Sequence, residues 1–276
     1  MRMAFAIVVL IIAASVVALV AGTTGWNRDS EAAVAKLVSS PLPASTYNVG
    51  SVESLPPPVQ RFFRAVLKHG QPIVRSATAT QEAEFFINGS WRPLRATQHF
   101  TTSPPGFVWD ARIEMAPLMP ASVRDAYVGG RGMMQASMFG LYTLADQVDK
   151  PELNAGALQR YLGEAVWFPT ALLPSPAVSW APRDDRSAIV TLRDGVTQVS
   201  LALAFDDRGF VTFVSGDRFK ESGGSYTIRP WEIRCDEHSE RNGMIIPLRC
   251  EVAWVTNGTA EPYWRGRITS ITYGYN

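Results

Sequence analysis

Charged residues are scarce in this sequence of 276 residues, where Asp, Glu, Lys and Arg together make up 18%. Soluble domains carry about a quarter, so we expect an uncharged membrane segment to dilute the average. The 26 basic and 25 acidic residues give a net charge of +1 and form no basic cluster. This balance argues against nucleic acid as a partner. The chain is long enough to bury a sizeable core, which excludes intrinsic disorder.

Histidine is also rare, and His69, His99 and His238 lie in unrelated segments. No two of them have the spacing of a metal-binding motif, so neither a metal site nor a metal hydrolase is predicted. The sequence also lacks the glycine-rich phosphate loop, the dinucleotide-binding fingerprint and the G-x-S-x-G nucleophile elbow. We therefore expect no cofactor, and the sequence favours a function other than catalysis.

Only two cysteines are present, Cys235 and Cys250, in neighbouring strand-like segments. In an oxidising compartment, a disulfide closing this loop would stabilise the fold by about 3 kcal/mol. Two unpaired buried thiols are the alternative, and the sequence leaves both open. Without a histidine pair nearby, the two cysteines do not predict a zinc site.

An uncharged run extends from Met3 to Ala21. As a helix it measures roughly 28 Å, close to the thickness of a bilayer core. We predict that residues 1–21 form an uncleaved membrane anchor; a signal peptide, whose apolar region is usually shorter, is the alternative. Arg2 precedes the run and Arg28 is the first cation after it. This weakly favours a cytoplasmic amino terminus, hence a single-pass protein of the inner membrane with its domain outside the cytoplasm.

Residues 22–54 are small, polar and punctuated by prolines, with a short helical stretch over 31–38, and are predicted as a linker. The domain is predicted over 55–276. Apolar residues at helical spacing predict one helix after the prolines at 56–58 and a second over 153–168, with Asn154 as its N-cap.

Period-two patterns separated by turn residues predict strands through the rest of the domain. The expected strands are 75–87, 91–101, 107–115, 177–181, 187–193, 197–206, 210–219, 225–235, 245–255 and 263–273. The stretch 116–149, rich in Met and Gly, is harder to interpret and suggests short strands. Because helices and strands do not alternate, the fold class is α+β: a strongly curved antiparallel sheet, or half-barrel, of about ten strands covered by two or three helices.

The candidate site lies in the second predicted helix. Arg160 and Glu164 are one turn apart, where a cation and a carboxylate can pair. Tyr161 and Trp167 add large amphipathic groups, and Trp109 is a candidate from the strands. Glu164 could serve as an acid/base or polar anchor held ionised by Arg160. A surface ion pair with core aromatics is the alternative.

Six tryptophans fall in six different strand-like stretches, and together with the methionines they could line an apolar concavity. They are Trp91, Trp109, Trp180, Trp231, Trp254 and Trp264. An ordinary aromatic core is the alternative.

Two motifs carry a resemblance to a known family. The segments LPPPVQRFFR at 55–64 and RYLGEAVWFPTA at 160–171 resemble an uncharacterised bacterial family of unknown function, over roughly residues 55–276. That family brings no established activity and no catalytic residue. The expected architecture also resembles the periplasmic lipoprotein-carrier fold, which implies shelter for acyl chains, although an anchored chain departs from a diffusing carrier.

The leading hypothesis is a membrane-anchored extracytoplasmic protein that binds a lipid, an acyl chain or another apolar molecule in a half-barrel cavity. Arg160, Tyr161, Glu164, Trp167 and Trp109 are its candidate ligand-binding residues. One alternative is a hydrolase-like enzyme that uses Glu164, which requires that carboxylate to be buried at a pocket. The other is a structural envelope-interaction module, which requires the concave face to be filled by its own side chains.

Overall fold

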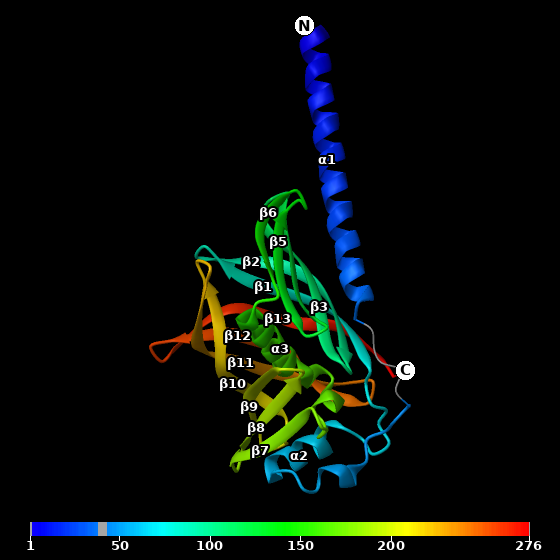
Figure 1. Ribbon diagram of the computed structural model, residues 1–276, viewed down its shortest axis with the longest axis vertical. Helices are drawn as coiled ribbons and strands as arrows, with labels where there is room; N and C mark the ends of the chain where they lie inside the picture. The colour runs from blue at the N-terminus through cyan, green and yellow to red at the C-terminus, as the bar shows by residue number, and fades with distance from the viewer. Residues whose placement is uncertain (1, 38–42, 276) are drawn as a thin grey trace.

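A computed structural model describes residues 2–37 and 43–275, and within them thirteen strands form one antiparallel sheet (Figure 1). The strands are β1 (Ser76–Ile87), β2 (Ser90–Thr102), β3 (Pro105–Ala116), β4 (Met119–Val128), β5 (Arg131–Met138), β6 (Tyr142–Val148), β7 (Val178–Asp184), β8 (Ser187–Asp194), β9 (Thr197–Phe205), β10 (Val211–Ser222), β11 (Ser225–Arg241), β12 (Met244–Thr256) and β13 (Thr259–Gly274). Their order across the sheet is β6-β5-β4-β3-β2-β1-β13-β12-β11-β10-β9-β8-β7. Sequence neighbours thus pair throughout, except for β6 and β7, which form the two edges of the sheet, and the single long-range pairing is β1 with β13.

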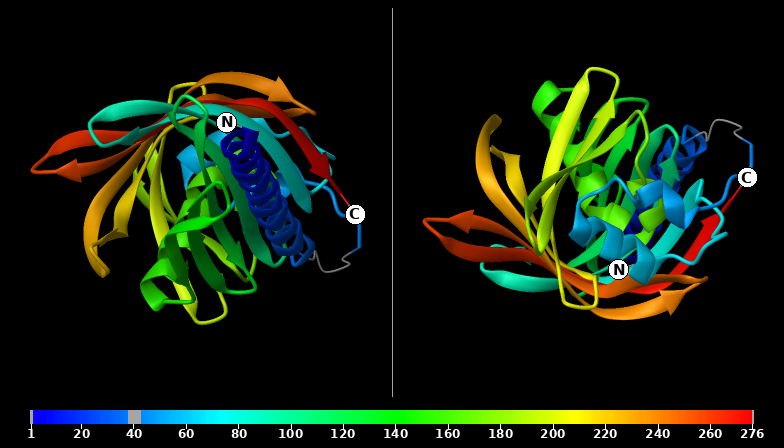
Figure 2. Two further views of the ribbon diagram at one scale, coloured as in Figure 1. Left: turned by 90° about the horizontal axis from the view of Figure 1, so that it is seen from above. Right: turned by 90° about the horizontal axis from the view of Figure 1, so that it is seen from below.

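The sheet curves around one helix, α3 (Pro151–Glu164) (Figure 2). This helix contacts β3, β4 and β5 on one side and β9 and β10 on the other. Because these strands stand in opposite halves of the sheet order, contact with both requires the sheet to wrap. The predicted antiparallel, curved sheet is confirmed.

The predicted count of about ten strands is wrong. The difference is the stretch 116–149, which forms β4, β5 and β6. Gly129 and Gly130 mark the turn between β4 and β5, but the other two turns place Leu118 and Phe139, which are not turn formers, in left-handed backbone, so composition marks those two boundaries poorly.

The helix α3 starts earlier than the sequence indicated. Lys150 is its N-cap residue, without a side-chain hydrogen bond, and Pro151 occupies the first turn. Asn154, the predicted N-cap, lies inside the helix. Its Oδ1 accepts a hydrogen bond from the Gly132 backbone N–H at 2.6 Å and so ties α3 to β5. The predicted helix continues after Glu164 as two short 3-10 turns, η2 (Ala165–Trp167) and η3 (Pro169–Leu172).

A second helix, α2 (Pro57–Val66), follows the 3-10 turn η1 (Val49–Val52) and packs against β8 and β12. Its apolar face is the one that helical spacing predicted: Val59, Phe62, Phe63 and Val66 are buried. Phe62 meets Phe205 of β9 with 5.4 Å between ring centroids. The helix therefore closes the end of the core that lies furthest from the chain's amino terminus (Figure 1).

The first helix, α1 (Arg2–Ala35), is long and apolar enough to cross a membrane. It extends past the predicted span into the segment expected to be a linker, and this second part packs on the outer face of β3 and β4. A stripe of Gly22, Trp26, Ser30 and Ala33 is buried there.

Polar contacts fix that packing. The guanidinium of Arg124 in β4 lies 4.3 Å from the ring centre of Trp26 and donates hydrogen bonds to the Trp26 carbonyl and the Ser30 hydroxyl, both at 2.7 Å. Ser30 and Trp26 in turn donate to the carboxylate of Asp110 in β3. The second part of α1 is therefore a docked helix.

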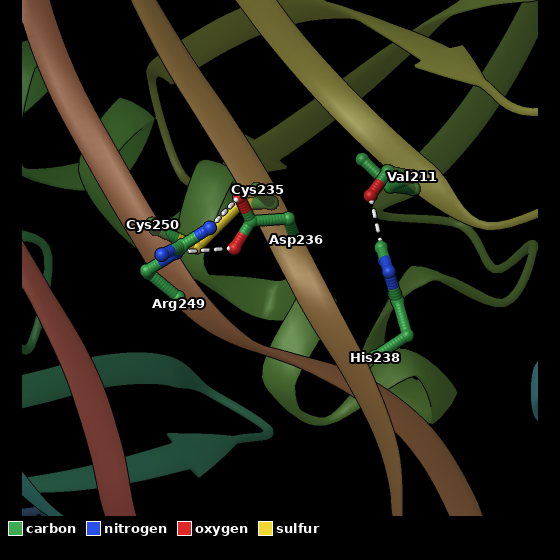
Figure 3. The surroundings of a disulfide bond; sticks show 6 residues. All are labelled: Val211, Cys235, Asp236, His238, Arg249 and Cys250. Carbon is green, nitrogen blue, oxygen red and sulfur yellow. Dashed lines mark hydrogen bonds and ion pairs between the residues drawn. A yellow bond between two sulfur atoms is a disulfide. The ribbon is translucent and has the colours of Figure 1, made fainter.

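The two cysteines are joined in a disulfide across β11 and β12, where Cys235 and Cys250 are direct cross-strand partners (Figure 3). Beyond Cys235 along β11, His238 donates from Nε2 to the Val211 carbonyl at 2.9 Å and stacks on Phe210. The disulfide joins the two strands of the β11–β12 hairpin, and the hydrogen bond of His238 ties that hairpin to β10.

Acid is expected to weaken the fold through His238. Burial lowers the pKa of this imidazole below its ordinary value, so the unfolded chain takes up the proton more readily. The stability that the neutral imidazole contributes at pH values above its ordinary pKa is then lost as the pH falls towards its lower pKa in the folded chain. In His238→Gln, which keeps an N–H donor for Val211 and cannot titrate, unfolding free energy should decline less between about pH 7 and about pH 5. Urea titrations at each pH would measure the free energy of unfolding. If it declines with pH as much in the variant as in the wild type, this role of His238 is wrong.

Candidate functional site

A cavity of about 660 Å³ lies between α3 and the concave face of the sheet. One stripe of α3 lines it at spacings of three and four residues, including Leu153, Gly156, Arg160 and Glu164. Strands β1, β3 to β6 and β10 to β13 supply the other walls. The aromatic lining residues are Phe85, Trp109, Trp167, Phe219, Tyr226, Trp231, Trp254, Tyr263 and Trp264.

Four of the six strand tryptophans considered in the sequence line this cavity, namely Trp109, Trp231, Trp254 and Trp264. The other two belong to different surroundings. Trp91 packs on Phe86, and Trp180 donates from Nε1 to the Leu172 carbonyl at 2.9 Å.

Arg160 is the centre of a polar cluster on the cavity wall. Its Nε lies 2.8 Å from Oε1 of Glu164, and its Nη1 lies 2.6 Å from Oδ2 of Asp125 in β4. The three side chains are only 17%, 11% and 10% exposed, respectively. The guanidinium also lies over the ring of Trp109, 4.8 Å from its centroid. The ion pair is thus largely buried, which contradicts the alternative of a surface pair.

Two glutamines extend this cluster into the sheet. Gln98 donates from Nε2 to Oε2 of Glu164 at 2.7 Å, and its own Oε1 accepts from Gln81 at 2.8 Å. The Oε1 of Gln81 accepts from the indole N–H of Trp109, also at 2.8 Å. A continuous hydrogen-bonded chain therefore runs from Asp125 through Arg160, Glu164 and both glutamines to Trp109. Such a network holds each side chain in one rotamer.

The electrostatics of the cluster are set by burial and by two carboxylates around one cation. Glu164 and Asp125 together raise the pKa of Arg160 against the opposing effect of burial, so the guanidinium stays charged. Burial raises the pKa of Glu164, and the contacts with Arg160 and Gln98 oppose that rise. Glu164 is thus the carboxyl of the cluster that burial predisposes to take up a proton.

The structure brings together four of the five residues predicted to bind a ligand. Arg160, Glu164, Trp167 and Trp109 all line the cavity, whereas Tyr161 is not among its lining residues. Tyr161 follows Arg160 in the helix and points about 100° away from it. It packs in the core against Phe100 and Phe168, where burial raises its pKa.

Trp167 carries an orphaned polar group. Its indole Nε1 is buried and has no hydrogen-bond partner within residues 2–37 and 43–275. A buried N–H without a partner lowers the stability of the fold, because its hydrogen bonds to water are lost and not replaced.

Asp125, Gln98 and Gln81 were missed as site residues by the sequence reasoning. The alternation of buried and exposed residues along the strands carried a signal for the two glutamines. Gln81 stands between Ala79 and Ala83 in the buried register of β1, and Gln98 holds an equivalent position in β2. A polar residue in an apolar register is unusual unless it has a buried partner.

In the part of the chain that the structure describes, no group of three or more His, Cys, Asp or Glu side chains could hold a metal ion. Besides the Arg160 cluster, the cavity lining includes the charged residues Glu152, Arg218, Lys220 and Glu221, and the guanidinium of Arg218 lies over the rings of Trp231 and Trp254.

Comparison with known proteins gives a family without an assigned activity. Residues 53–273 match the family of unknown function DUF6920, and because this is most of the chain, the protein belongs to that family. The predicted membership of an uncharacterised family is thereby confirmed. No curated protein shows a significant match.

Solved structures give only distant matches. A domain from Vibrio parahaemolyticus named for outer membrane lipoprotein sorting is 8% identical with a TM-score of 0.40, covering 72% of this chain and 85% of its own. A LolA superfamily protein from Nitrosomonas europaea is 9% identical with a TM-score of 0.39, covering 78% and 90%. A DUF1329 family protein from Desulfovibrio piger is 4% identical with a TM-score of 0.40, covering 72% and 86%. These similarities are too distant to assign a ligand to this chain.

Proposed function

We propose that this DUF6920 protein is held in a membrane by α1 and binds an apolar molecule, a lipid or an acyl chain, in the cavity between α3 and the sheet. The observation that carries the proposal is the cavity itself, about 660 Å³, lined mainly by apolar and aromatic side chains, with the Arg160 cluster and a few further charged residues in its walls. Small-molecule sites have roughly 300–1,000 Å³, mostly apolar walls and a few convergent polar groups. The cavity has all three properties.

The Arg160 cluster suits an uncharged polar group on that molecule. With both carboxylates ionised, the single cation leaves the cluster with a net charge of −1, which disfavours an anionic group beside it. Within the described residues, Nη2 of Arg160 donates to no protein acceptor, and Oδ1 of Asp125 accepts from no protein donor. A hydroxyl can accept from the first and donate to the second. The proposed ligand is therefore a molecule with an apolar body and a hydroxyl or similar neutral head.

Two other functions fit the cavity less well. A hydrolase-like enzyme needs Glu164 buried at a pocket, and Glu164 does line the cavity. However, both of its carboxylate oxygens are engaged, by Arg160 and by Gln98, which suits an anchor better than a proton shuttle. A purely structural module needs a filled concave face, and the volume of the cavity favours binding over that role.

The proposed location is the inner membrane, with the sheet outside the cytoplasm. The disulfide between Cys235 and Cys250 supports it because such bonds persist in oxidising compartments. Cysteines found reduced in whole cells would contradict this location.

Filling the cavity is expected to abolish binding. Gly156 lies on the cavity side of α3, and a Cβ added there would meet its nearest neighbours at 3.9 Å, so a larger side chain would extend into the open space. The full chain would be placed in lipid nanodiscs that contain a monoacylglycerol with a photoreactive acyl chain, which has the neutral hydroxyl head proposed above. After illumination, peptide mass spectrometry should find crosslinks in α3 and β10 to β13 as well as in α1.

In Gly156→Phe, the α3 and sheet crosslinks should disappear while those of α1 remain. Val196→Phe adds the same ring on a fully exposed turn and should leave both sets intact. If the wild-type chain crosslinks only through α1, the proposed ligand class is wrong.

A further inference from the structure

Five large apolar side chains are exposed on two neighbouring turns of the sheet. They are Leu118 and Met119 between β3 and β4, and Leu141, Tyr142 and Leu144 at and after the turn between β5 and β6, with exposures of 96%, 46%, 54%, 69% and 51%. We name this set the apical patch. Turns at a protein surface are usually polar, and contiguous exposed apolar side chains mark an interaction site.

The two turns lie at the same end of the sheet. Ala121 in β4 pairs with Met138 in β5, so the residues just before Ala121 and just after Met138 are close together. Both strands lie in the part of the sheet on which α1 is docked. The apical patch is therefore one surface built from two loops.

The apical patch stands where the apolar run of α1 ends. Gly22 follows the last residue of that run, and its backbone is in close contact with Gly140 of the β5–β6 turn. A Cβ on Gly22 would lie 2.6 Å from the Phe139 carbonyl oxygen and 2.7 Å from the Leu141 side chain. Figure 1 shows the tip of the β5–β6 hairpin beside α1 at this level.

We propose that the apical patch inserts into the surface of the same bilayer that α1 crosses. The inference rests on the membrane anchoring in the proposed function and adds a second contact with lipid. The patch is continuous with the apolar segment of α1 through Gly22 and Leu141, which favours a bilayer over a separate protein partner. Tyr142 is the residue type that membrane interfaces prefer, with an apolar ring and a polar tip.

The inserted hairpin is also a wall of the cavity. Met134 and Ala136 of β5 and Ala145 and Gln147 of β6 line it from the inner face. One element thus contacts lipid with its tip and the proposed ligand with its side. Insertion would place the cavity directly beside the membrane that supplies an apolar ligand.

Depth-dependent quenching tests the insertion. Both cysteines of the wild-type chain are in the disulfide, so a cysteine introduced as Tyr142→Cys can be labelled alone with a fluorophore under non-reducing conditions. The full chain would be reconstituted in vesicles of phosphatidylethanolamine and phosphatidylglycerol that contain nitroxide-labelled phospholipid. Asp185→Cys is the matched control, because Asp185 is exposed on the β7–β8 turn, at the end of the domain far from the amino terminus of α1 (Figure 1).

The label at position 142 should be quenched several-fold more strongly than the label at 185. Equal, weak quenching at both positions in a chain that resists carbonate extraction would overturn the insertion and leave the anchor in place. Release of the chain by carbonate would refute the anchor and, with it, the insertion. Crosslinking inside the cavity is a separate readout, so failure of ligand binding is distinguishable from both.

Discussion

Replacing Arg160 by methionine is expected to lower the free energy of unfolding by about 3–5 kcal/mol, which would be the largest effect of any single substitution in the cavity wall. The substitution removes the cation that lies 2.8 Å from Glu164 and 2.6 Å from Asp125. Two largely buried carboxylates then face each other without compensation. Urea unfolding of the full chain in micelles, followed by near-ultraviolet circular dichroism, would measure the loss.

Arg95→Met is the matched control for this prediction. Arg95 pairs with Glu82 at 3.6 Å on an exposed surface, so its loss should cost at most about 1 kcal/mol. Adding Asp125→Asn and Glu164→Gln to Arg160→Met should recover part of the stability, because both uncompensated charges disappear. Equal losses for Arg160→Met and Arg95→Met would show that the cluster does not act as a buried ionic network.

Removing the disulfide is expected to have the second largest effect. In Cys235→Ala/Cys250→Ala, the free energy of unfolding should fall by about 3 kcal/mol, the chain-entropy value for a loop of 15 residues. The strands β11 and β12 remain hydrogen-bonded along their length, so the fold itself should survive. Thermal unfolding of the full chain would measure the change.

A reducing agent provides the control for the disulfide. It should lower the stability of the wild-type chain towards that of the double variant and leave the double variant unchanged. An equal response of the two proteins to reduction would mean that the agent acts elsewhere, and a double variant as stable as the wild type would remove the structural role of the bond.

Much of the fold could be predicted because its strands are long and punctuated. Turn residues such as Asn88-Gly89 and Asp194-Gly195 mark the hairpins, and the structure places them between β1 and β2 and between β8 and β9. The stretch 116–149 was harder to divide into strands because two of its turns, at Leu118 and Phe139, have left-handed backbone at residues other than the usual glycine or asparagine.

Of the polar cluster in the site, only the residues on α3 could be predicted from the sequence. Arg160 and Glu164 are visible because helical spacing brings them together within one turn. Asp125 comes from β4, and Gln98 from β2, and nothing in local spacing connects either strand with α3. The direction of Tyr161 shows the same limit, since neighbours on a helix face different surroundings.

The docking of α1 on β3 and β4 has a mechanical consequence. A domain joined to its anchor by a flexible tether samples many heights and tilts. Here the contacts among Trp26, Ser30, Asp110 and Arg124 hold α1 and the sheet together as one rigid unit. For a chain that crosses a bilayer, that coupling gives the domain a constant height above the membrane and a constant orientation. A domain anchored in this way would bind the proposed ligand beside one membrane, unlike a carrier that diffuses between two.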